Sequence, residues 1–488
     1  MTGVSGTVFV VHGRLEDLTW QGAVIVTDDR GLVGKTWRGL SLSQDAPLDM
    51  SDGWALVPAD VPVAAVSIEA TYDVVLDRID HCLERFRSAI SRDHATATPP
   101  LVAVPVVGIG RGGFGDDRGE ILRRLLERLA STTRRLGLDV AVVTPDPSVY
   151  AAAQHLRRGG PSVLPPELEN AARDLGGLAA RGRLALFTGA GVSAPSGLPT
   201  WTTLLGQLAD LYDISDLIEE TAGLSATDVA GLIEQHAPKT FQADVAARFT
   251  GDHRPSLLHA LLAGLDAHEV VTTNYDLLFE RAVEATGRGI TSVLPWQSAV
   301  DNERWILKLH GDVDHADQSV LTRHHMVRYD AANRPSASLL QSLLLTRHTL
   351  FVGLSMSDDN VIRLMHEVQE YRRVNEAAAT GRFGTVLDVR GDAARASLWQ
   401  DQLHWLDLSV SDLGPGTRVI RLFLDRVAVH AARDASWLLD ERFAGLLPPE
   451  HREVARLARD LNADLPADDG PWAVLRAALR ELGATPPD

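Results

Sequence analysis

The feature that most constrains the fold is a repeated pattern in which a short apolar segment ends in glycine and polar residues. Four such clusters follow one another along the second half of the chain, at Gly189–Ser193, Thr272–Asp276, His310–Asp312 and Gly353–Asn360. Segments with helical periodicity, such as 201–213 and 255–265, separate them. Strands that alternate with helices favour a parallel sheet covered on both faces. Because ligands of such a sheet bind beyond the carboxyl ends of its strands, we expect the four clusters to form one site.

The first cluster reads GAGVSA and follows the apolar segment 184–188. It fits the pattern G-x-G-x-x-[G/A], in which Gly189 permits a tight turn and Gly191 lets a phosphate approach backbone N–H groups. Two prolines, the second of them Pro199, delay the next helix, which departs from an ordinary dinucleotide-binding unit. A glycine turn that merely joins a strand to a helix stays an alternative interpretation.

The second and third clusters supply groups suited to catalysis. Asn274 and Asp276 are two residues apart, so both can face a cleft if the strand remains extended. Asp276 is also suited to cap the helix that follows it. His310 stands at a strand end beside a glycine, where it can serve as a general base near neutral pH. A histidine that only satisfies its own polar neighbours is the alternative.

The composition disfavours several classes of binding partner. A formal net charge of -18 over 488 residues disfavours binding to nucleic acid. The single cysteine, Cys82, excludes a four-cysteine zinc module and an intrachain disulfide. The spacing of His315, His324 and His325 matches no usual zinc pattern, so we expect no metal. We find no signal-peptide pattern and no apolar run of membrane-spanning length, and we expect a cytoplasmic protein.

Breaks in periodicity divide the chain into four parts. Residues 1–157 alternate apolar strands with amphipathic helices and are expected to form a separate α/β domain. Glycines and prolines interrupt the pattern over 158–166, which we interpret as a linker. The parallel-sheet domain, with a helical insertion, is expected over 167–425, and a helical extension over 426–488.

The four clusters taken together resemble the sirtuin (SIR2) superfamily. GAGVSAPSGLP, TTNYD, LHG and VGLS occur in the family's order, and the resemblance covers roughly residues 166–425. It implies a Rossmann-like parallel sheet of the sirtuin type. Protein-deacylating sirtuins carry a four-cysteine zinc module and read TQN before the aspartate, whereas here Thr273 precedes Asn274. The chain is more similar to bacterial SIR2-like proteins that hydrolyse NAD in anti-phage defence.

This resemblance implies an NAD+ glycohydrolase that releases nicotinamide and ADP-ribose and needs no metal. Asn274 would hold the ribose and a water molecule, and His310 would contact a ribose hydroxyl or act as the base. Asp276 would meet the nicotinamide carboxamide. The remaining predicted binding residues are Gly189, Ala190, Gly191, Ser193, Pro199, Thr273, Gly353, Ser355 and Asn360. For Asn360, a helix cap is the alternative.

Other functions remain open at this stage. A SIR2-like domain can sense NAD or ADP-ribose without turnover, and an enzyme of this kind can instead act as a cyclase, a protein deacylase or an ADP-ribosyltransferase. Asn274 and His310 favour catalysis over binding alone, and the missing cysteines disfavour deacylation. Whether water or an adenine nitrogen captures the ribose carbon cannot be decided from the residues.

A second glycine-rich segment lies in the first region, from Gly108 to Gly115, and includes Gly112. It follows a strand, opens a helix and resembles the glycine loop of macro domains, which bind ADP-ribose. The resemblance implies a macro-like domain that senses a nucleotide and regulates the enzyme; a surface for a phage or partner protein, such as an ATPase, and a plain scaffold are the alternatives. Because related effectors commonly assemble, we also expect a homo-oligomer.

Overall fold

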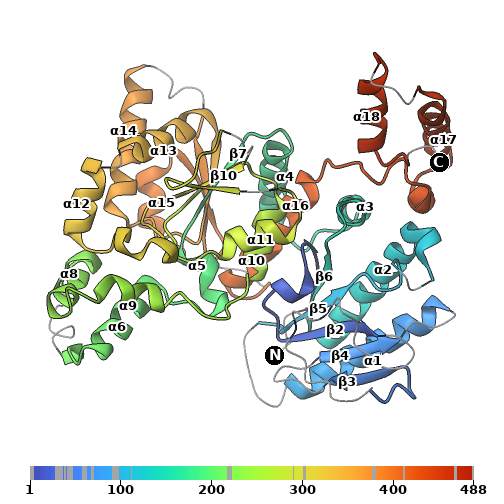
Figure 1. Cartoon of the computed structure of the whole chain (residues 1–488), viewed down its shortest axis with the longest axis horizontal. Coiled ribbons are helices and arrows are strands. Elements are labelled where there is room, and N and C mark those ends of the chain that lie inside the picture. The colour runs from blue at the N-terminus through green and yellow to red at the C-terminus, as the bar shows by residue number, and fades with distance from the viewer. Residues whose placement is uncertain are drawn as a thin grey trace. The chain divides into compact units, whose positions relative to one another are not determined.

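A computed structural model gives the fold (Figure 1). It describes residues 5–27, 37, 40, 48–57, 63–67, 71–90, 98–110, 113–216, 223–289, 291–300, 304–332, 334–375, 381–409, 413–466 and 470–485. The chain divides into two compact units. The first comprises Met1–Gly176, Ala285–Gly287 and Asp412–Asp488, and the second comprises Gly177–Glu284 and Arg288–Ser411.

The first unit is built on a six-stranded mixed sheet in the order β1-β6-β5-β2-β4-β3. Its strands are Val8–His12 (β1), Gly22–Thr27 (β2), Trp54–Val57 (β3), Val63–Ser67 (β4), Leu101–Pro105 (β5) and Asp139–Thr144 (β6). β3 runs antiparallel to β4, and the other pairs are parallel. The helices before the second unit are Tyr72–Ile90 (α1), Arg118–Leu136 (α2), Pro147–Arg158 (α3) and Pro166–Ala179 (α4), with short turns at Leu15–Asp17 (η1) and Gly115–Asp117 (η3).

The C-terminal segment belongs to this first unit. It forms Gly416–Ala431 (α16), Glu441–Leu446 (η7), Pro449–Asp464 (α17) and Ala473–Glu481 (α18). Two ion pairs tie α16 to the sheet and to α3: Arg418 Nη2 lies 2.8 Å from Asp139 Oδ1 in a buried pair, and the partly buried Arg157 pairs with Asp425. The boundary predicted between residues 425 and 426 therefore lies inside α16.

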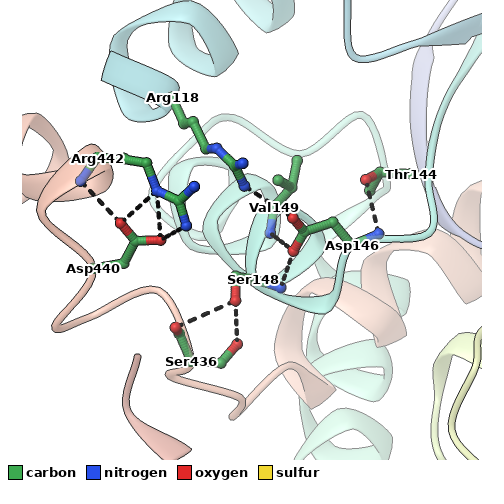
Figure 2. Close-up of polar contacts among 8 residues, drawn as sticks. All are labelled: Arg118, Thr144, Asp146, Ser148, Val149, Ser436, Asp440 and Arg442. Atoms are coloured by element: carbon green, nitrogen blue, oxygen red, sulfur yellow. Dashed lines mark hydrogen bonds and ion pairs between the residues drawn. The ribbon is translucent and has the colours of Figure 1, made fainter. Parts of the chain in front are cut away.

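Polar contacts also join the start of α3 to the segment that follows α16 (Figure 2). Asp146 accepts hydrogen bonds from the backbone N–H groups of Ser148 and Val149, and it pairs with Arg118 at 3.0 Å. The Ser148 hydroxyl lies 3.0 Å from that of Ser436. Apolar side chains of the same C-terminal segment, Trp437 and Phe443 among them, lie in the core of the first unit.

The second unit is built on a seven-stranded sheet in the order β13-β12-β11-β7-β8-β10-β9, and every pair is parallel. Its strands are Leu184–Thr188 (β7), Glu269–Thr272 (β8), Thr291–Leu294 (β9), Arg304–Lys308 (β10), His348–Val352 (β11), Gly384–Asp388 (β12) and Leu403–Asp407 (β13). Its helices and turns are Ala190–Ser193 (α5), Ala194–Ser196 (η4), Trp201–Leu211 (α6), Ala226–His236 (α8), Phe241–Ala247 (α9), Leu257–Gly264 (α10), Leu278–Ala285 (α11), Val313–Gln318 (η5), Arg323–Ala332 (α12), Arg334–Thr346 (α13), Asp359–Val374 (α14) and Ala393–Trp399 (α15).

Both faces of this sheet are buried, as is typical of a parallel sheet. Successive residues of a strand point to opposite faces, yet Leu186 and Phe187 are both fully buried, as are Leu350 and Phe351. The predicted parallel sheet with helices on both faces is therefore confirmed. Helices α6, α8 and α9 form a smaller apolar cluster together with Tyr275 and Leu321, and these helices correspond to the expected helical insertion.

The order of the strands fixes where a ligand can bind. β7 is the first strand of this sheet in sequence. The chain continues from β7 to β8 and β10 on one side of it, and later adds β11, β12 and β13 on the other side, so the strand order reverses at β7. A crevice beyond the carboxyl ends of the strands is expected at such a switch point. Within the described part of the chain, none of the helices has the length and apolar character needed to cross a membrane.

Candidate functional site

Three glycines bring the ends of β7 and β11 together at the switch point. The N–H of Gly189 donates to Val352 O at 3.0 Å, and the N–H of Gly191 donates to Gly353 O at 2.9 Å. A Cβ on Gly191 would lie 2.8 Å from Gly353 Cα, and one on Gly353 would lie 2.7 Å from Val192 N. Gly353 also has a φ of +69°, which side chains disfavour. The glycines therefore allow two backbones to pack where larger residues would collide.

Asn274, which follows β8, is held against the β7 turn. Its Nδ2 donates to Ser193 Oγ at 2.9 Å and to Gly189 O at 3.2 Å. Its Oδ1 is buried and has no hydrogen-bond partner among the described residues. Because a buried amide oxygen normally accepts a hydrogen bond, this atom is an acceptor available to a ligand or a water molecule.

His310, which follows β10, is paired with a carboxylate from beyond β11. Its Nε2 lies 3.0 Å from Asp358 Oδ2, and the two side chains are only 11% and 19% exposed. Asp358 Oδ1 also caps α14 by accepting from two backbone N–H groups. Burial alone would raise the pKa of Asp358, but His310 and these N–H groups outweigh burial and lower it. In the described part of the chain, no hydrogen-bond partner contacts His310 Nδ1.

Asp276 is buried beside this site and is used locally. One of its carboxylate oxygens accepts from the backbone N–H of Leu278 at 3.0 Å, at the start of α11. Lys308 donates to the backbone carbonyl of Asp276 and forms a buried ion pair with Glu280 at 2.8 Å. The contact of the Asp276 carboxylate with Leu278 is thus a helix-capping contact, which was the alternative to a role of Asp276 at the nicotinamide.

Comparison with known protein families finds a match within the second unit. Residues 268–403 match the family model described as the SIR2-like domain. The chain contains a SIR2-like domain. The chain is also similar to "NAD(+) hydrolase ThsA" of Acinetobacter baumannii, which is 27% identical over 196 residues, 39% of this chain and 40% of that protein.

Two further proteins are similar to this chain. "NAD(+) hydrolase ThsA" of Bacillus cereus is 28% identical over 189 residues, 38% of this chain and 40% of that protein. "Defense-associated sirtuin 2" of Bacillus subtilis is 28% identical over 204 residues, 39% of this chain and 20% of that protein. The match spans about 40% of the length of the ThsA relatives. Among solved structures, the match with "Alphavirus P23pro-zbd" covers 63% of this chain and 46% of that chain, at a TM-score of 0.25 and 12% identity.

The other predicted site residues have the following places in the second unit. Ala190 begins α5, and the N–H of Thr273 donates to Thr188 O at 3.3 Å. Asn360 lies in the first turn of α14, whose cap is Asp358. Pro199 is half-buried ahead of α6, and Ser355 is exposed, with its hydroxyl 2.6 Å from that of Ser357.

Two residues of the second unit were not singled out from the sequence. Asp358 lies within a predicted cluster, but a carboxylate before a helix indicates a cap and gives no sign of a contact with His310. His259 lies inside the apolar helix α10, and its Nε2 is 3.2 Å from Ser193 Oγ. A lone histidine in an apolar helix carries no signal of such a contact.

The histidines that follow His310 form separate pairs. His315 Nδ1 lies 2.8 Å from Asp312, and His325 Nε2 lies 3.1 Å from Glu234. Across the described ranges, no group of three or more His, Cys, Asp or Glu side chains is arranged to hold a metal ion.

Proposed function

We propose that this chain is an NAD+ glycohydrolase that cleaves NAD+ to nicotinamide and ADP-ribose and acts as an effector of anti-phage defence. One observation carries the proposal: an unsatisfied buried acceptor on Asn274 and the His310–Asp358 pair occupy the carboxyl edge of a SIR2-like domain. The relatives named as NAD+ hydrolases and as a defence-associated sirtuin support the same activity.

The chemistry needs few groups from the protein. In NAD+ the ribose C1′–nicotinamide nitrogen bond breaks, and its electron pair leaves with nicotinamide, which becomes neutral. The sugar passes through an oxocarbenium-like state, which a water molecule attacks to form the new C1′–O bond. Asn274 Oδ1 would accept a hydrogen bond from this water or from a ribose hydroxyl, and so orient the attack.

His310 would accept the proton. Because Nε2 contacts Asp358, Nδ1 is the nitrogen that would receive a proton from the attacking water or from a ribose hydroxyl. Asp358 would stabilise the imidazolium that forms, and the proton would then pass to solvent. We also propose that the predicted glycine and serine positions line the diphosphate and adenosine, with Asp276 near the nicotinamide.

Separation of the reaction products tests this function. The full chain is incubated with NAD+, and nicotinamide, ADP-ribose and cyclic ADP-ribose are resolved by chromatography. We expect nicotinamide and linear ADP-ribose, with rates at least about 10²-fold lower in Asn274→Ala and in His310→Ala. His236→Asn, at an exposed position on α8, is the matched control. Cyclic product alone would identify a cyclase, and NAD+ binding without turnover would identify a sensor.

The first unit would regulate the enzyme by binding a nucleotide such as ADP-ribose, as a macro-like domain. The segment after β5 supports this proposal, because a Cβ built on Gly110 or Gly113 meets no atom of the other described residues within 4 Å, apart from its chain neighbours. Gly112 lies outside the described residues. Calorimetric titration of Asn274→Ala with ADP-ribose should give two sites per chain, and Gly110→Trp in that background should leave one. A single site in both proteins would contradict the proposal.

A further inference from the structure

A line of buried hydrogen bonds runs away from Asn274 into the domain. Asn274 Nδ2 donates to Ser193 Oγ, which lies 3.2 Å from His259 Nε2. On the other side of the ring, the backbone N–H of Ser256 donates to His259 Nδ1 at 3.0 Å. Ser193 and His259 are only 3% and 1% exposed, so water has little access to either of them.

These contacts determine which nitrogen of His259 carries the proton. A backbone N–H can only donate, so Nδ1 must accept from Ser256 and cannot itself be protonated. The Ser256 hydroxyl also lies 2.9 Å from Nδ1, but it donates its one proton to Val192 O at 2.9 Å, so the backbone N–H is the donor that Nδ1 accepts from. In the neutral ring the proton is therefore on Nε2, which donates to Ser193 Oγ.

The protonation of His259 supports the observed orientation of Asn274. Ser193 Oγ has two acceptor positions, and it receives one hydrogen bond from His259 and one from Asn274 Nδ2. The carboxamide therefore keeps its NH2 group toward Ser193, and its Oδ1 is left as the atom without a partner. Gly189 O accepts from the same NH2 group, so the contact from His259 is one of two supports: without it, the serine hydroxyl would be free to rotate and only the contact with Gly189 O would remain.

The surroundings of His259 keep it neutral. Burial, the largest effect, lowers its pKa to about 4; Asp276 opposes this change and Lys308 adds to it. The ring therefore keeps an acceptor toward Ser256 and a donor toward Ser193 throughout the neutral pH range.

We propose that His259 is a positioning residue, which acts through Ser193 to hold the Asn274 carboxamide with its oxygen toward the ribose and the attacking water. The catalytic part of this inference, an effect of His259 on nicotinamide release, rests on the proposed function. Its geometric part concerns only the side chain of Asn274, and it can be tested without turnover.

Two substitutions separate the two sides of the ring. In His259→Asn the amide oxygen takes the place of Nδ1, so the Ser256 contact survives and the donor toward Ser193 is lost. In His259→Gln the terminal NH2 takes the place of Nε2, so the donor is kept. We expect kcat for nicotinamide release to fall between about tenfold and a hundredfold in His259→Asn, with a smaller change in KM. His259→Gln should recover most of kcat, and His236→Asn should be unchanged.

A second measurement reports the position of Asn274 directly. The chain is labelled with 15N at asparagine only, and the side-chain NH2 signals of Asn274 are assigned from their loss in Asn274→Ala. We expect these signals to shift, and their protons to exchange faster with solvent, in His259→Asn but not in His259→Gln. Thermal unfolding of each variant verifies that it is folded.

The outcomes distinguish this inference from the proposed function. Unchanged Asn274 signals in a folded His259→Asn overturn the inference, whatever the activity. Altered signals with an unchanged kcat overturn the catalytic part of it. Altered signals together with a wild-type chain that never releases nicotinamide support the positioning of Asn274 and reject the proposed glycohydrolase.

Discussion

At the scale of single residues, Asp358 performs two tasks with two oxygens. Oδ1 caps α14 through the N–H groups of Asn360 and Val361, and Oδ2 contacts His310. Asparagine is about as good a helix cap as aspartate, but it carries no charge. A single substitution can therefore remove the charge beside His310 while leaving the helix cap in place.

We expect Asp358→Asn to fold normally and to lose at least about 10²-fold in kcat, because the imidazolium formed during proton transfer loses its counter-charge. The measurement is the rate of nicotinamide release, with the unfolding free energy determined in parallel. Asp359→Asn, which removes the same charge from the neighbouring exposed position, should keep full activity. Equal rates in the two variants would show that Asp358 is a helix cap and nothing more.

The contacts between site residues, such as His310 with Asp358, could not be predicted from the sequence. Asn274 and His310 could be singled out as candidates because each closely follows an apolar strand within a short motif. Their contacts with Ser193 and Asp358 join segments that are far apart in the chain, so they depend on the strand order. No local pattern contains that order.

At the scale of elements, the junction of β7 with β11 depends on the absence of a side chain at Gly353. Gly182 provides a matched comparison, because its φ of +63° is close to the +69° of Gly353 but no atom lies within 4 Å of a built Cβ. Alanine at Gly182 therefore meets backbone strain alone, whereas alanine at Gly353 also collides with the backbone of Val192.

We expect Gly353→Ala to lower the unfolding free energy by about 2–5 kcal/mol, and Gly182→Ala by about 1 kcal/mol. Urea denaturation followed by circular dichroism measures both. Similar losses in the two variants would mean that backbone conformation, and not the close approach of β11 to β7, determines the need for glycine.

Element boundaries also show which parts of the fold could be predicted. The apolar segment 184–188 forms β7, and the helical periodicity over 201–213 and 255–265 corresponds to α6 and α10. The edge strands β9 and β13 carry no such pattern. β9 is a four-residue edge strand, and β13 carries a polar and a charged residue among its five, so neither presents the continuous apolar pattern of a buried strand.

At the scale of the whole molecule, the two ends of the chain build one unit. Phe443 from η7 is fully buried in the core of the first unit, and Leu446 is the residue that a Cβ on Gly119 of α2 would meet, at 2.9 Å. Amphipathic periodicity predicted helices in this segment, but it does not state which partner the apolar face packs against. The C-terminal residues are thus part of the core of the first unit.

This packing predicts a local effect of Phe443→Ala in the full chain. Removing a buried phenylalanine side chain costs about 3–5 kcal/mol, so the first unit should open more often than in the wild type. Hydrogen exchange followed by mass spectrometry should become faster in α2 and β6, while β7 and β8 of the second unit keep their protection. Leu457→Ala, at a position 54% exposed on α17, should change neither. Faster exchange confined to residues 434–485 would instead mean that the C-terminal segment is an appendage, on whose packing the first sheet does not depend.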